Sequence, residues 1–213
     1  MGIVAIASLV VVFVVVVFVV GRIVVRLAMR AAARKLLTSV GAKALERLPD
    51  RISVTAAPNH SWSSSTADSY ARDLLDLGFE DAGTFAVDQL DGVYVRLLAH
   101  ETERIAAAVY EHPKTGVWFD LFKHYADGRS VTHTTTRSRG LERRPGTRVE
   151  HEPGATPARL FERIRAEHDE GELLAMTTAN VAERFSDACT RDCEWRKHKG
   201  ISTAEVARVA RSR

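Results

Sequence analysis

The hydrophobic and polar positions of the chain first form a long apolar run. From Ile3 to Val20 no residue carries a charge, and the apolar character continues to Val25. A run of this length can cross a bilayer as a helix, whereas a single strand in lipid would leave its backbone polar groups unpaired. The pattern therefore predicts a transmembrane anchor at residues 1–25.

The flanks of this run predict its orientation. No Lys or Arg precedes it and no small-residue cleavage site follows it, which favours a permanent anchor over a cleaved signal. Basic side chains follow it at once: Arg22, Arg26, Arg30, Arg34 and Lys35. By the positive-inside rule, we expect a single-pass protein of the inner (cytoplasmic) membrane with its N-terminus outside and its soluble domain in the cytoplasm.

The same basic residues predict a juxtamembrane helix at residues 26–49. Four of the arginines recur every fourth residue and would share one helical face. Beside a membrane, this face would contact anionic lipid headgroups; the alternative is that these charges only set the topology. Pro49 disfavours helix at the residue before it, so we expect the domain boundary there.

Beyond residue 50 the period of the pattern becomes two, which is typical of strands. Asp91-Gly92 and Asp127-Gly128 each lie between alternating runs, a strong hairpin signal. A shorter run at Ile52 and Val54 predicts a first strand. The longer runs predict strands at 84–90, 93–99, 104–112, 117–126 and 129–136.

Three segments have helical periodicity. The serine-rich segment before Tyr70 begins a helix that ends near Gly78, and Thr156-Pro157 has the cap and first-turn chemistry of a second helix. A third runs from about Thr178 to Lys199 and stops at Gly200. The expected fold is α+β: an N-terminal transmembrane helix, then a domain at 50–200 with a five- to six-strand antiparallel meander and about three helices. Residues 201–213 would be a basic tail or short helix.

The charge of the chain is unevenly distributed. The sequence holds 30 Lys and Arg residues against 27 Asp and Glu, and residues 1–50 hold seven of the former and two of the latter. The remainder is therefore slightly acidic, which argues against a nucleic-acid partner. Within it, one basic patch crowds a long polar loop: Arg137, Arg139, Arg143, Arg144 and Arg148. Such a patch could meet phosphates or acidic partners, or be solvated charge without a specific role.

Three stretches carry a resemblance. The order LGFEDAGTF, AVYEHPKTGVWFDL and YADGRSVTHTTT behind one N-terminal anchor resembles the soluble regions of uncharacterised bacterial membrane proteins. The resemblance covers residues 50–200. It implies the architecture above and no activity or functional residues.

One group of side chains could carry chemistry. If Asp127-Gly128 is a two-residue loop, Phe122 lies opposite His133, and Asp120, His124 and His133 share one face of the sheet. Two imidazoles and a carboxylate at this spacing could bind a divalent metal or supply a general base with its orienting partner. A register slip of one residue would send a histidine to the other face. The alternative is that these are ordinary, partly buried histidines.

Other chemistry has weaker support in the sequence. Cys189 and Cys193 lie four residues apart, where they could contribute to a zinc site or pack as small core residues beside Phe185. Gly-x-Ser-x-Gly, Gly-x-x-x-x-Gly-Lys and Gly-x-Gly-x-x-Gly are absent from the sequence. We therefore expect no resident metal and no cofactor.

Taken together, these patterns favour a binding function. We expect a membrane-tethered cytoplasmic domain that binds a membrane-associated protein partner through its sheet, with the ligand unnamed, and we do not expect an enzyme. The alternative is a membrane-tethered metal-dependent or acid/base enzyme using Asp120, His124 and His133. An oligomeric structural element ranks last, because the valine-rich span has few small residues on one face.

Overall fold

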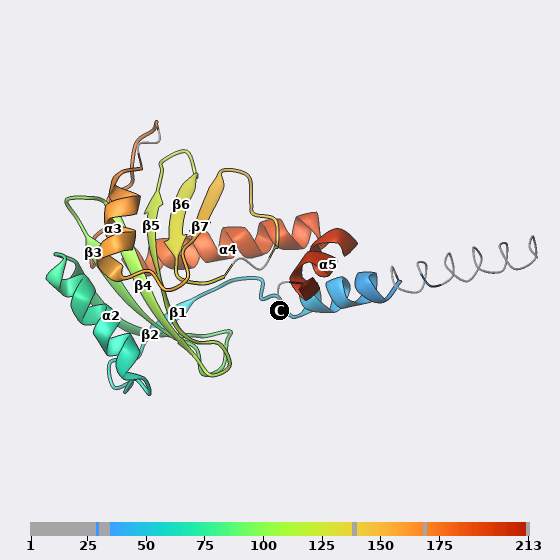
Figure 1. Cartoon of the computed structure of the whole chain (residues 1–213), viewed down its shortest axis with the longest axis horizontal. Helices are drawn as coiled ribbons and strands as arrows, with labels where there is room; N and C mark the ends of the chain where they lie inside the picture. The colour runs from blue at the N-terminus through green and yellow to red at the C-terminus, as the bar shows by residue number, and fades with distance from the viewer. Residues whose placement is uncertain (1–28, 30–34, 138–139, 168–169, 212–213) are drawn as a thin grey trace, which may run out of the picture.

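The computed structural model describes residues 29, 35–137, 140–167 and 170–211. Its centre is one sheet of seven strands that follow one another in chain order (Figure 1). The strands are β1 (Val54–Ala56), β2 (Glu80–Val87), β3 (Tyr94–His100), β4 (Ile105–His112), β5 (Gly116–His124), β6 (Ser130–Thr134) and β7 (Thr147–His151). The helices are α2 (Ser65–Asp76), α3 (Pro157–Arg165), α4 (Val181–Lys199) and α5 (Thr203–Arg211). Residues 35–46 are also helical.

The chain is α+β, but its sheet differs from the predicted meander. β1 to β6 pair antiparallel, whereas β7 pairs parallel to β6, so the sheet is mixed and has seven strands. The prediction of a five- to six-strand antiparallel sheet was therefore wrong. The difference arises at residues 147–151, which we expected to lie in a loop. They pair parallel beside β6, and a parallel neighbour requires a crossover connection.

The predicted transmembrane element also needs correction. Among the residues that the structure describes, no helix is long and apolar enough to cross a membrane. A single-pass membrane helix is therefore not part of the fold described here. The predicted span at residues 3–20, with its continuation to residue 25, lies outside the described residues, as do Arg22, Arg26, Arg30 and Arg34; Lys35 is exposed at the start of the helical residues 35–46.

Helices cover both faces of the sheet (Figure 1). α2 and α3 pack on one face, and α4 lies across the other. The core under α2 and α3 contains Leu74, Phe79, Leu98, Ile105, Phe119, Leu121, Leu160 and Ile164. The core under α4 contains Val95, Leu97, Phe122, Met176, Val181 and Phe185. Alternation along β4 and β5 supplies both cores, because successive side chains of a strand point to opposite faces.

The helix boundaries follow from capping chemistry. Ser64 precedes α2 and its hydroxyl accepts a hydrogen bond from the Thr66 N–H. Thr156 accepts the N–H of Arg159 at 3.3 Å, and Pro157 occupies the first turn of α3, where its missing N–H costs nothing. Gly200 ends α4 with a φ of 82°, in the left-handed region that favours glycine.

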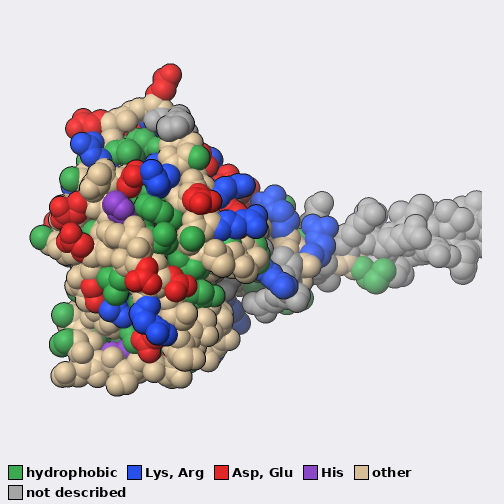
Figure 2. Space-filling model, turned by 60° about the vertical axis from the view of Figure 1, so that its left-hand side comes forward, with side chains coloured by type: hydrophobic (Ala, Val, Ile, Leu, Met, Phe, Trp, Pro, Cys, Tyr) green, Lys and Arg blue, Asp and Glu red, His purple; other side chains and the backbone are tan. Residues whose placement is uncertain are grey.

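The helical residues 35–46 contact the C-terminal part of the chain. Gly41 is buried, and a Cβ at this position would meet the Ile201 carbonyl oxygen at 3.1 Å. Glycine therefore permits this close approach. Figure 2 shows many Lys and Arg side chains at the end of the molecule where this helix joins the domain.

Candidate functional site

The hairpin between β5 and β6 decides which predicted site residues meet. Tyr125 donates its N–H to the Arg129 carbonyl at 3.0 Å, so residues 126–128 form a three-residue loop instead of the predicted two-residue loop. The Asp127 carboxylate accepts the Arg129 N–H at 3.0 Å, and Gly128 has a φ of 85°. This loop moves the register by one residue: Leu121, not Phe122, lies opposite His133.

The new register separates His133 from the other two candidates. Asp120 and His124 lie on the α4 face of the sheet, whereas His133 lies on the α3 face with no exposed surface. There the His133 Nε2 lies 3.2 Å from Glu167 Oε1, and Nδ1 lies 3.5 Å from Glu152 Oε1. The predicted cluster of Asp120, His124 and His133 therefore does not form on one surface.

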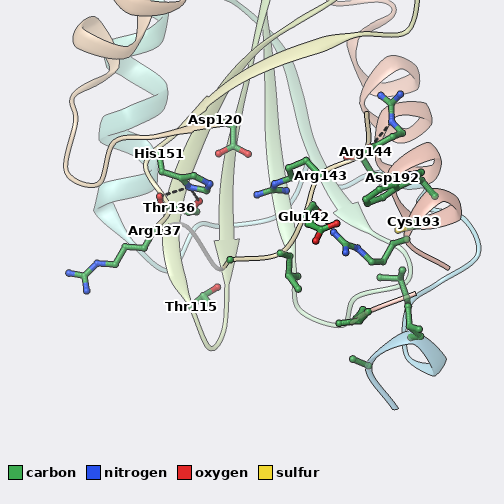
Figure 3. A pocket seen from close by; sticks show the side chains of 18 of the residues that line it. Thr115, Asp120, Thr136, Arg137, Glu142, Arg143, Arg144, His151, Asp192 and Cys193 are labelled. Carbon is green, nitrogen blue, oxygen red and sulfur yellow. Dashed lines mark hydrogen bonds and ion pairs between the residues drawn. The ribbon is translucent and has the colours of Figure 1, made fainter. Parts of the chain in front are cut away.

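A cleft opens on the α4 face of the sheet and contains Asp120 (Figure 3). Its outer chamber has a volume of about 580 Å³, and its inner chamber, between the sheet and α4, has about 230 Å³. The two chambers share the lining residues Asp120, Thr136, Arg143 and Asp192. The shared residues make them parts of one cleft, in which a ligand could extend from the surface to the sheet.

Asp120 projects into this cleft from the middle of β5. Its Oδ1 is inaccessible to solvent and has no hydrogen-bond partner among the described residues. Burial raises the pKa of Asp120 to about 6, although hydrogen bonds from Thr134 and Tyr110 and the charge of Arg143 act in the opposite direction. A carboxyl whose pKa is raised in a cleft is a common feature of functional sites.

Arg143 reaches the cleft from the loop that precedes β7. We call residues 140–146 the arginine loop. Figure 3 shows the Arg143 guanidinium extending across the cleft toward Asp120 and His151. Its charge lowers the pKa of Asp120. The side chain is exposed, and in the described part of the chain no ion pair or hydrogen bond engages its guanidinium. Its donors are therefore available to a ligand.

Neighbouring contacts fix the arginine loop in place. Arg144 donates to the Asp192 carboxylate on α4 and to the Gly128 carbonyl, each at 3.0 Å. The Glu142 N–H donates to Glu205 Oε1 at 3.0 Å, which ties the loop to α5. The backbone on either side of Arg143 is thus held by α4 and α5, whereas the Arg143 side chain itself is exposed.

The inner chamber is lined by many hydroxyl groups. They belong to Tyr110, Ser130, Thr132, Thr134, Thr136 and Thr147. His124 lines the same chamber. Burial lowers its pKa to about 4, and the charges of Arg191, Arg184 and Arg144 act in the same direction. Burial also raises the pKa of the Cys189 thiol to about 12. At neutral pH these groups therefore offer uncharged hydrogen-bonding partners.

The outer chamber adds aromatic and imidazole groups. Trp118 stacks on Tyr110 with ring centroids 4.7 Å apart. His151 donates from Nδ1 to the Thr136 carbonyl at 3.0 Å, which fixes its ring beside Asp120 (Figure 3). His112 accepts the Lys114 N–H at its Nδ1, also at 3.0 Å. These side chains provide flat, partly apolar walls around the arginine and the carboxyl.

The two cysteines that the sequence suggested as zinc ligands lie beside the cleft. Cys189 and Cys193 pack against the core under α4 and line the cleft. Within the described residues, no group of three or more His, Cys, Asp and Glu side chains has a geometry that could hold a metal ion. The arrangement therefore favours hydrogen bonding and charge recognition at Arg143 and Asp120.

The decisive residue, Arg143, was not among the predicted site residues. The sequence did show a basic patch in its loop, but nothing in the pattern distinguishes Arg143 from Arg144, whose charge is paired in the fold. Comparison of the chain with protein-family models, curated proteins and solved structures gives no match.

Proposed function

We propose that this protein is a binding domain for a small molecule that carries an oxyanion, a carboxylate or phosphate group, and that the cleft is its site. The observation that carries the proposal is the unpaired Arg143 guanidinium directed into the cleft opposite Asp120. A guanidinium presents a planar fork of donors that matches the oxygens of a carboxylate or phosphate.

The other charges of the cleft favour Arg143 as the anchor. Arg144 also lines the outer chamber, but its charge is paired with Asp192 at 3.0 Å. Arg196 is paired with Glu205 at 2.8 Å. Figure 3 shows Arg137 pointing away from the cavity. Among the described residues that line the cleft, Arg143 is therefore the cation best placed to meet an anion that enters it.

The shape of the cleft supports a small organic ligand. The outer chamber, about 580 Å³, falls within the usual size of small-molecule sites, and the inner chamber extends it by about 230 Å³. The hydroxyl-rich inner chamber suits a polar group, and the aromatic walls of the outer chamber suit a flatter, less polar part. An oxyanion at Arg143 would lie where the chambers join.

Replacing the anchor tests the proposal. In Arg143→Gln, we expect sulfate to bind at least tenfold more weakly than to the wild-type chain, because the charged, forked donor is lost; this corresponds to about 1.4 kcal/mol. Isothermal titration calorimetry of the full chain with sulfate measures the dissociation constant.

A matched control separates the site from general charge. Arg72 is exposed on α2, on the opposite face of the sheet, and Arg72→Gln removes the same charge. Its sulfate affinity should equal that of the wild-type chain. Equal affinities in Arg143→Gln and wild type, or no binding of sulfate by the wild type, would overturn the proposal.

A further inference from the structure

Asp120 faces the place where the proposed ligand would bind. It lines both chambers, as Arg143 does, and the two side chains act on each other electrostatically without forming an ion pair. An oxyanion held by Arg143 would therefore lie beside the Asp120 carboxyl. If that carboxyl stayed ionised, two like charges would lie close together, which is unfavourable.

The groups around Asp120 come from every element packed against it. They are Tyr110 on β4, His112 at the end of β4, His124 on β5, Thr134 on β6, His151 on β7, Arg143 on the arginine loop, and Cys189 and Asp192 on α4. Arg143 is the cation that acts on Asp120 from the arginine loop, and Arg144 neutralises Asp192. The negative charge of the Asp120 carboxylate is therefore balanced by the Arg143 guanidinium. A bound oxyanion would interact with this same guanidinium.

Most of these neighbours keep one protonation state near neutral pH. Burial raises the pKa of Tyr110 and raises that of Cys189 to about 12, so the phenol and the thiol stay neutral. Burial lowers the pKa of His124 to about 4, so this imidazole is neutral as well. Two further imidazoles, His112 and His151, line the outer chamber, and the experiment controls for both.

We propose that Asp120 takes up a proton when the oxyanion binds and then donates a hydrogen bond to it, so that the ligand is recognised by a guanidinium and a carboxylic acid together. This inference rests on the proposed function. The proton comes from the solvent and is added to the Asp120 carboxylate; no bond of the ligand breaks. The bound state then holds one anion, one cation and one neutral acid.

This mechanism fixes the direction of the pH dependence. In the free protein the pKa of Asp120 is about 6. The bound anion pairs with the Arg143 guanidinium and places a second negative charge beside Asp120. The pKa of Asp120 is therefore higher in the complex. Binding therefore takes up protons above the free pKa. Affinity should rise about tenfold per pH unit as the pH falls from about 8 to about 7, and level off below about 6.

Sulfate is a suitable probe, because its own charge stays constant over this range. Calorimetric titration of the full chain across the pH series should give the slope described above. Asp120→Asn, which resembles the protonated acid in shape and can donate a hydrogen bond, should bind sulfate with little dependence on pH. At the alkaline end its affinity should match that of the wild type at the acid end.

Two variants control for the neighbouring imidazoles. His112 and His151 also line the outer chamber, so His112→Gln and His151→Gln are titrated in the same series. If Asp120 is the group that titrates, both retain the slope. A slope that persists in Asp120→Asn, or disappears in either histidine variant, would overturn the inference.

A second measurement does not depend on the folding of a variant. Titrating the wild-type chain in two buffers of different ionisation enthalpy gives the number of protons taken up with sulfate. Near pH 7.5 we expect close to one. Binding that requires Arg143 but takes up no proton overturns this inference and leaves the proposed function standing, whereas binding that does not require Arg143 overturns the proposed function.

Discussion

At the scale of single residues, Glu205 joins α5 to the arginine loop. Its side chain is fully buried and accepts hydrogen bonds from Arg196 at 2.8 Å, from the Ser202 N–H at 2.9 Å and from the Glu142 N–H at 3.0 Å. Lys199 adds an ion pair at 3.1 Å. Because one carboxylate satisfies donors from α4, from Ser202 before α5 and from the arginine loop, its loss would affect all of them.

Replacing this carboxylate should destabilise the fold. Glu205→Gln removes a fully buried carboxylate and leaves the part-buried Arg196 without this counter-charge, and we expect the free energy of unfolding to fall by about 3 kcal/mol. Urea denaturation followed by circular dichroism measures this change. The control is Glu194→Gln, an exposed position on α4, whose stability should stay within about 0.5 kcal/mol of wild type. Equal losses in the two variants would contradict the assigned role of Glu205.

The same residue predicts an acid dependence. Burial tends to raise the pKa of Glu205, but hydrogen bonds from Ser202 and Glu142 and from Lys199 and Arg196 outweigh burial and lower the pKa overall. Its contribution is therefore fully present above the ordinary glutamate pKa of about 4.3 and is lost as the pH falls below that value. In urea titrations from neutral to acid pH, Glu205→Gln should lose less stability than wild type; parallel losses would contradict this.

At the scale of elements, α4 forms one wall of the cleft and covers one face of the sheet. Phe185 anchors it: the side chain is buried and its ring lies 6.1 Å from that of Tyr110 and 6.5 Å from that of Phe122. Phe185 also lines the inner chamber. The same contact therefore stabilises the fold and shapes the site.

Truncating this anchor should affect stability and binding together. In Phe185→Ala we expect the free energy of unfolding to fall by about 3 kcal/mol, through lost burial and the cavity that remains. Sulfate affinity should also weaken as α4 shifts against Asp120. Asp187→Ala, at an exposed position two residues further along α4, is the control in thermal denaturation and calorimetry. An unchanged midpoint in Phe185→Ala would show that α4 is not anchored this way.

The sequence pattern predicted elements better than their pairing. Alternating runs around Asp91-Gly92 and Asp127-Gly128 correspond to β2–β3 and β5–β6, because glycine supplies the positive φ of the turns. The pattern could not show that the second turn has three residues, since the dipeptide fits either length. That one residue moves His133 to the other face. β7 was missed because a five-residue strand in a polar segment gains its stability from β6 and not from its own sequence.

At the scale of the whole molecule, the cleft is assembled from distant parts of the chain. β5 supplies Asp120, the arginine loop supplies Arg143, β7 supplies His151 and α4 supplies Asp192. The parallel return of the chain to β7 brings the arginine loop over the α4 face of the sheet. Periodicity reports local structure, so it could identify the basic patch but not the carboxyl that the patch faces.

Locating a bound oxyanion tests the central claim most directly. Crystals of the full chain would be soaked with selenate, a close analogue of sulfate, at about pH 6, near the pKa of Asp120. We predict an anomalous-scattering peak in the cleft, in hydrogen-bonding contact with the Arg143 guanidinium and the Asp120 carboxyl. A cleft without selenate while other surface sites are occupied, or a cleft peak that persists unchanged in Arg143→Gln, would contradict the account.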